Sequence, residues 1–120
     1  GLPSFEGVKH GAQETLESAK RVLAEKQAEF KKTSESKLSA LESKLGELRQ
    51  KAAQAGERAK PELEKLVHEL EEKRAQAATK LADWKSTRSG AWHSFATQVD
   101  QTLTDLDQKI EKALSRSKSK

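Results

Sequence analysis

Apolar residues recur every three or four positions between Leu16 and Leu114, with only two short interruptions. This spacing puts them on one stripe of an α-helix, which turns once every 3.6 residues. Helices of this kind bury a narrow stripe against other helices and leave their remaining faces in water. The sequence therefore predicts an all-α fold, either an antiparallel helical hairpin or a coiled-coil bundle.

The chain is short of core-forming residues. Leu, Ile, Val and Phe number only 22 among 120 residues, whereas 35% of the residues are charged. The 23 basic and 19 acidic residues nearly cancel, and together with the regular periodicity this favours a folded chain over a disordered one. Because a chain of this size and composition buries little apolar surface, we expect it to form a homo-oligomer or to pair with a partner coiled coil.

The periodicity divides the chain into three parts. Residues 1–11 contain Pro3, Gly7 and Gly11 without a period and are expected to form a flexible N-terminal arm. Residues 12–114 form the helical hairpin or bundle, with helices at about 12–57, 61–85 and 91–114, and residues 115–120 form a basic tail. Proline is tolerated at the first position of a helix but not in its interior, so Pro61 either starts a new helix or kinks a long one.

The strongest pattern lies between Leu38 and Ala59. Apolar residues there step by three and four in strict alternation, as in a left-handed coiled coil. Before Leu38 the steps follow an eleven-residue repeat, which favours a straighter packing seam. The polar residues 32–36 between the two patterns either break the helix or lie inside it. We favour a continuous helix, because this stretch contains neither Gly nor Pro.

Residues 86–90 carry the clearest turn signal of the chain. Gly90 can adopt a positive φ, and the serines can cap the helix that follows. A turn this short makes the last helix run back antiparallel along the one before it.

The residues expected to carry the packing and the interactions share the predicted stripe. In addition, Trp84 and Trp92 are expected to pack on each other and on Phe95 and so to lock the hairpin end. The alternative role for the two indoles is to anchor the chain at a membrane surface. The predicted packing residues are Leu41, Leu45, Leu48, Leu66, Leu70, Trp84, Trp92, Val99, Leu103, Leu106 and Ile110.

No motif in the sequence points to catalysis, a cofactor, a metal or a small-molecule substrate. Glu64, His68 and Glu72 lie four residues apart on one helical face, but the Glu-x-x-His spacing of dinuclear helical sites is missing. We interpret His68 as a solvated residue in a row of ion-pairing side chains. We expect no enzymatic activity, because nucleophile elbows, phosphate-binding glycine loops and zinc-protease motifs are all lacking.

The net charge of +4 does not indicate a nucleic-acid partner. Three of the positive charges lie in the tail, and the helical body mixes acids with bases. Specific nucleic-acid binding requires a concentrated basic face. Four acid-to-base pairs at i,i+4 are expected on the solvated faces, namely Glu17 with Arg21, Glu47 with Lys51, Glu69 with Lys73 and Asp105 with Lys109.

The sequence is compatible with more than one compartment. The sequence has no Cys, no apolar run that approaches the length of a membrane span and no visible leader. The alternatives are the bacterial cytoplasm or, if a leader was removed before Gly1, an exported location.

The chain from Leu38 to Leu114 resembles uncharacterised bacterial coiled-coil proteins that have a Lys/Glu/Ala-rich long helix, a Ser-Gly-x-Ala-Trp turn and an amphipathic return helix. Ala59-Lys60-Pro61-Glu62-Leu63 also resembles the proline-punctuated amphipathic repeats of exchangeable apolipoproteins. The bacterial resemblance implies a structural or interaction role. Its matching residues are Lys73-Arg74, Ala78, Lys80-Leu81 and Ser89-Gly90-Ala91-Trp92.

Taken together, these observations predict a non-enzymatic structural or protein-interaction coiled coil that self-associates. The alternative is reversible binding to a membrane or lipid surface through amphipathic helices, in an apolipoprotein-like or stress-protective role. A metal-binding helical bundle is the least favoured of the three.

Overall fold

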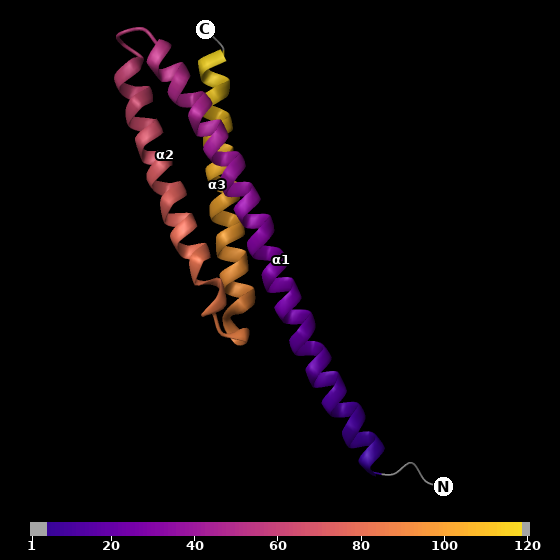
Figure 1. The fold of residues 1–120 in the computed structure, drawn as a ribbon. Helices are drawn as coiled ribbons and strands as arrows, with labels where there is room; N and C mark the ends of the chain where they lie inside the picture. The colour runs from indigo at the N-terminus through magenta and orange to yellow at the C-terminus, as the bar shows by residue number, and fades with distance from the viewer. Residues whose placement is uncertain (1–4, 119–120) are drawn as a thin grey trace.

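The computed structural model consists of three α-helices and two short 3-10 turns (Figure 1). The helices are α1 (Phe5–Gln54), α2 (Lys60–Leu81) and α3 (Trp92–Lys118). The structure describes the backbone of residues 5–118 and the side chains of residues 17–116. No strand is present over residues 5–118, and the predicted all-α fold is confirmed.

The three helices pack side by side in an up-down-up order. α1 and α2 are antiparallel, as are α2 and α3, so α1 and α3 run in the same direction. Two ion pairs between α1 and α3 show this, because Lys37 with Asp100 and Lys44 with Asp107 are both 63 residues apart. Sixty-three residues are nine heptads, so α1 and α3 keep the same heptad register at both ion pairs.

α1 starts and ends at places that differ in part from the prediction. It begins at Phe5, so helix replaces most of the arm expected over residues 1–11, and residues 1–4 lie outside the described part. It runs without interruption through residues 32–36, as favoured above. Of the two alternatives at Pro61, a new helix is the one observed, because α1 ends at Gln54 and Pro61 lies in the first turn of α2.

The turn between α2 and α3 lies where it was expected, but its chemistry differs. The segment consists of two 3-10 turns, Ala82–Lys85 and Ser89–Ala91. No described residue has a positive φ, so Gly90 does not adopt the left-handed conformation. The hydroxyls of Ser86 and Thr87 donate to the carbonyl oxygen of Asp83, and they therefore cap the preceding turn rather than α3.

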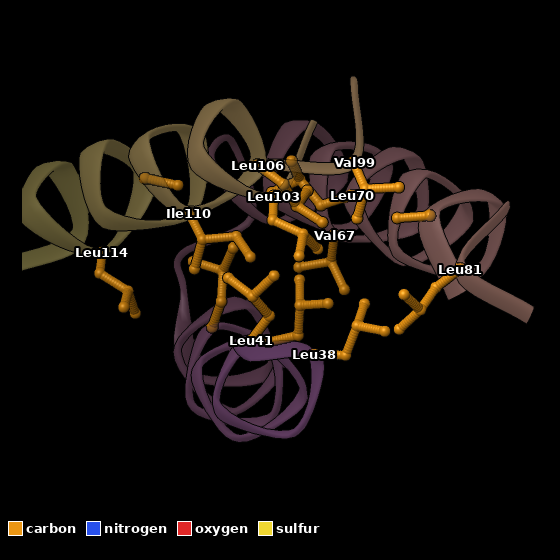
Figure 2. Packing of buried hydrophobic residues seen from close by; sticks show 14 of the residues in the cluster. Leu38, Leu41, Val67, Leu70, Leu81, Val99, Leu103, Leu106, Ile110 and Leu114 are labelled. Atoms are coloured by element: carbon orange, nitrogen blue, oxygen red, sulfur yellow. The ribbon is translucent and has the colours of Figure 1, made fainter. Parts of the chain in front are cut away.

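The core is a single cluster between the three helices (Figure 2). The heptad of α1 from Leu38 onward faces it, and Leu45 and Leu48 are fully buried. α2 contributes a heptad of its own, and α3 contributes its whole apolar stripe. Within one chain, α2 and α3 therefore bury their stripes, and α1 buries its stripe from Leu38 onward. The buried apolar residues are Leu38, Leu41, Leu45, Leu48, Ala52, Val67, Leu70, Ala77, Leu81, Phe95, Val99, Leu103, Leu106, Ile110, Ala113 and Leu114.

α1 is much longer than its two partners. At 1.5 Å per residue its 50 residues span about 75 Å, whereas the 22 residues of α2 span about 33 Å and the 27 of α3 about 40 Å. The N-terminal half of α1 therefore projects past the α2–α3 turn (Figure 1). It accounts for the elongated dimensions of the molecule, 85 × 23 × 16 Å.

Candidate functional site

The N-terminal half of α1 is the part of the described chain that the bundle leaves uncovered. We use the name projecting segment for residues 17–29, whose side chains the structure describes. None of them is buried, Leu23 and Gln27 are half-buried, and Val22 keeps 47% of its surface exposed. Because tertiary packing usually provides most of the stability of a helix, an uncovered stretch of this length suits a contact with another molecule.

An aromatic group lies where the projecting segment joins the bundle. The ring of Phe30 meets the ring of Trp92 edge-on, with the ring centres 5.4 Å apart, and it also contacts Phe95. Trp92 and Phe95 are 5.4 Å apart. The expected contact of Trp92 with Phe95 is therefore present. The hairpin end is held by Phe30 of α1 as well, a contact that the spacing of apolar residues did not predict.

Trp84 lies in a different environment. Its indole has the ammonium groups of Lys31 and Lys85 at 5.9 and 5.5 Å from the ring centre. Among the described residues, the ring of Trp84 does not contact the ring of Trp92. The prediction that the two indoles pack on each other is therefore wrong. Trp84 lies in the 3-10 turn Ala82–Lys85, whereas Trp92 is the first residue of α3.

Some of the predicted packing residues are half-buried and the others are buried. Leu66, Trp84 and Trp92 are half-buried at the edge of the core. In α2 Val67 is buried in place of Leu66, because the heptad of this helix runs through Leu63, Val67 and Leu70. The predicted packing residues that are buried are Leu41, Leu45, Leu48, Leu70, Val99, Leu103, Leu106 and Ile110.

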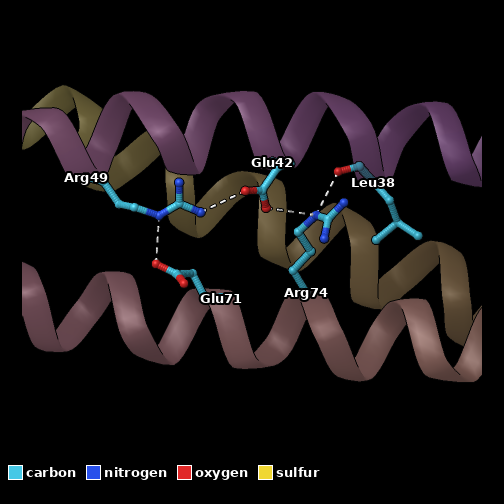
Figure 3. A network of polar contacts seen from close by, with 5 residues as sticks. All are labelled: Leu38, Glu42, Arg49, Glu71 and Arg74. Atoms are coloured by element: carbon cyan, nitrogen blue, oxygen red, sulfur yellow. Dashed lines mark hydrogen bonds and ion pairs between the residues drawn. The ribbon is translucent and has the colours of Figure 1, made fainter.

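A polar network joins α1 to α2 beside the core (Figure 3). Arg49 binds Glu42 of its own helix at 2.8 Å and Glu71 of α2 at 2.9 Å. Arg74 occupies a heptad position of α2, and its Nε donates to the carbonyl oxygen of Leu38 at 2.9 Å. The hydrogen bond from Arg49 lowers the pKa of Glu42, and the hydrogen bonds to Glu42 and Glu71 raise the pKa of Arg49.

The seam between α1 and α3 carries its own ion pairs. Lys44 binds Asp107 at 2.5 Å and Glu111 at 2.7 Å, and these two hydrogen bonds raise its pKa. Lys37 binds Asp100 at 3.2 Å. Such half-exposed pairs contribute little to stability, but they fix which residues face each other.

The four predicted i,i+4 pairs are not among the ion pairs of the described residues. The i,i+4 pairs found there are Lys31 with Glu35 and His68 with Glu72. The remaining ion pairs join residues that are seven or more positions apart in the sequence. Periodicity alone could not reveal these contacts, because they depend on how the three helices are aligned.

The histidines lie on exposed faces or outside the described side chains. The imidazole of His68 is 76% exposed and lies 3.5 Å from Glu72. His93 is exposed, and the side chain of His10 is not described. Residues 17–116 bring together no group of three or more His, Cys, Asp or Glu side chains that could hold a metal ion.

A shallow groove follows the seam between α2 and α3, with a volume of about 350 Å³. Lys73 and Lys80 of α2 and Lys109 of α3 lie along it, above Ala77, Val99 and Leu106. Lys109 lies beside Lys73 and lowers the pKa of that lysine. Within residues 5–118, no helix is long and apolar enough to cross a membrane.

Comparisons with known proteins add no family to this description. The chain matches no protein-family model, no curated protein and no solved structure.

Proposed function

We propose that this is a non-enzymatic structural or protein-interaction protein that self-associates through the projecting segment of α1. The observation that supports this proposal is the difference between the two halves of α1. From Leu38 onward its stripe is buried by α2 and α3, whereas residues 17–29 carry the same helix into solvent. The need for a second chain is therefore confined to the projecting segment, since the bundle completes its core alone.

The chemistry of the projecting segment favours another helix as its partner. Ala19, Val22 and Leu23 lie on one face, because residues three and four apart are neighbours on a helix. The segment holds three acids and three bases, namely Glu17, Glu25 and Glu29 with Lys20, Arg21 and Lys26. With no net charge it has no electrostatic preference for an anionic surface, and an apolar strip flanked by both signs of charge is typical of a coiled-coil face.

A matched pair of substitutions tests this proposal by sedimentation velocity over a range of protein concentrations. Leu23→Glu puts a carboxylate on the apolar face, and we expect it to weaken self-association about tenfold or more, since a buried unpaired charge is costly. Ala24→Glu puts the same charge on the opposite side of the segment and should leave self-association unchanged. Salt at high concentration should not dissociate the wild-type assembly, because its contacts are mainly apolar.

Two results would contradict the proposal. One is a wild-type protein that stays monomeric at every concentration tested. The other is an equal loss of self-association in both variants, which would mean that charge anywhere on the segment matters more than its apolar face.

Reversible binding to a lipid surface is the second candidate function. The observation that favours it is Trp84, a half-buried indole between two lysine ammonium groups, since tryptophan and lysine both suit the headgroup region of a membrane. Titration with anionic vesicles, followed by circular dichroism and by Trp emission, separates the two functions. A blue-shifted Trp emission supports lipid binding, and unchanged spectra exclude it.

A further inference from the structure

The groove between α2 and α3 has an apolar floor and a polar rim. Ala77, Val99 and Leu106 form the floor and are all buried. The polar side chains along the rim come from both helices, so a ligand there would touch α2 and α3 together. They are Lys73, Gln76, Lys80, Thr102, Asp105 and Lys109.

Lys73 and Lys109 face each other across this groove. Each has an acid one turn earlier in its own helix, Glu69 and Asp105 respectively, yet neither lysine forms an ion pair among the described residues. The nearness of Lys109 lowers the pKa of Lys73, and the more distant Glu69 and Asp105 only partly offset this effect. The groove thus holds two facing positive charges without a contacting carboxylate.

With the remaining residues of the rim included, the lining of the groove carries a net positive charge. Lys80 adds a third ammonium, which donates to the side chain of Gln98. Asp105 is the one carboxylate along the rim, so the lining carries three positive charges and one negative charge. Like charges that face each other repel, and an anion between them removes the repulsion and supplies acceptors to both.

We propose that this groove binds a phosphate-type oxyanion between Lys73 and Lys109. A phosphate group is compact enough for a groove of about 350 Å³, and its oxygens can accept hydrogen bonds from several ammonium groups at once. The amide of Gln76 lies on the same rim and can donate a further hydrogen bond. The site is separate from the projecting segment, so it does not depend on the function proposed above.

Isothermal titration with inorganic phosphate, at an ionic strength held constant with sodium chloride, tests the site. We expect wild-type protein to bind phosphate, and Lys73→Gln and Lys109→Gln each to bind about tenfold more weakly. Lys65→Gln is the matched control, because it removes the same charge from an exposed position of α2 outside the groove. It should bind phosphate as the wild type does.

The pKa of Lys73, followed by NMR, gives a second readout. Bound phosphate should raise this pKa, because a neighbouring anion favours the charged ammonium. Lys109→Gln should raise it without phosphate, because the neighbouring positive charge is gone. Equal phosphate affinity in wild type and both groove variants would overturn the proposal, and so would a pKa of Lys73 that phosphate leaves unchanged.

Vesicles distinguish the two sources of such a phosphate. The site would be assigned to a lipid headgroup if the protein co-sedimented with vesicles that contain phosphatidic acid but not with vesicles of phosphatidylcholine alone. In that case Lys73→Gln should abolish the co-sedimentation. Binding of inorganic phosphate without vesicle binding would assign it to a soluble phosphate compound. The absence of both would overturn the proposal.

Discussion

Leu45 provides the sharpest test of the core. Its side chain is fully buried in the middle of the bundle, where α1 faces both α2 and α3. Leu45→Ala removes three carbon atoms, which corresponds to about 2.4 kcal/mol at roughly 0.8 kcal/mol for each buried methylene. The cavity left behind adds to this loss, so we expect the free energy of unfolding to fall by about 2 to 5 kcal/mol.

Urea denaturation followed by circular dichroism measures this change. In a thermal melt the same loss should lower Tm by roughly 4 to 8 °C for each kcal/mol, as is usual for a domain of this size. Leu23→Ala is the matched control, because this leucine lies in the projecting segment and is only half-buried. We expect it to cost less than about 1 kcal/mol at protein concentrations where the chain is monomeric. Equal losses in the two variants would refute the division of α1 into a packed half and a projecting half.

Three further predictions concern polar groups of the bundle. Ser34 is 1% exposed and is the one buried polar side chain among those described, so Ser34→Ala should raise the free energy of unfolding by about 1 kcal/mol in urea denaturation. Arg74→Ala should lower the same free energy by about 1 kcal/mol, because it removes the hydrogen bond to the carbonyl of Leu38. Because Arg49 lowers the pKa of Glu42, the stability that Glu42 contributes is present above its unfolded pKa near 4.5 and is lost as the pH falls through its folded pKa. Melts between about pH 5 and about pH 3 should therefore show a smaller loss of stability in Glu42→Gln than in wild type.

The helices and their stripes could be predicted from the sequence, because helical periodicity depends only on the spacing of apolar residues along the chain. The heptad from Leu38 to Ala52 can be recognised without knowing which helices pack against it, and so can the stripe of α3. At Pro61 the sequence left two alternatives, a new helix or a kink, and the structure has a new helix that begins at Lys60.

The contacts between helices could not be predicted in the same way. Periodicity does not say how α2 and α3 lie against α1, so it could not predict the contact of Phe30 with Trp92 or the hydrogen bond from Arg74 to Leu38. In α2 both Leu66 and Val67 fit a helical stripe, and only the position of α1 and α3 decides that Val67 is buried. The facing lysines of the groove, Lys73 and Lys109, depend on the alignment of two helices that run in opposite directions.

The three helices of one chain enclose a shared core, with α1 and α3 parallel. The chain has no cysteine, so spin labels can be placed at will, and Lys37→Cys with Asp100→Cys labels two side chains that touch across this seam. We expect a short distance between these labels that persists after dilution with unlabelled protein. We expect labels at positions 37 and 112 to lie farther apart, since 12 residues of α3 span about 18 Å. If the first distance is no shorter than the second, or if it disappears on dilution, the single-chain bundle is wrong.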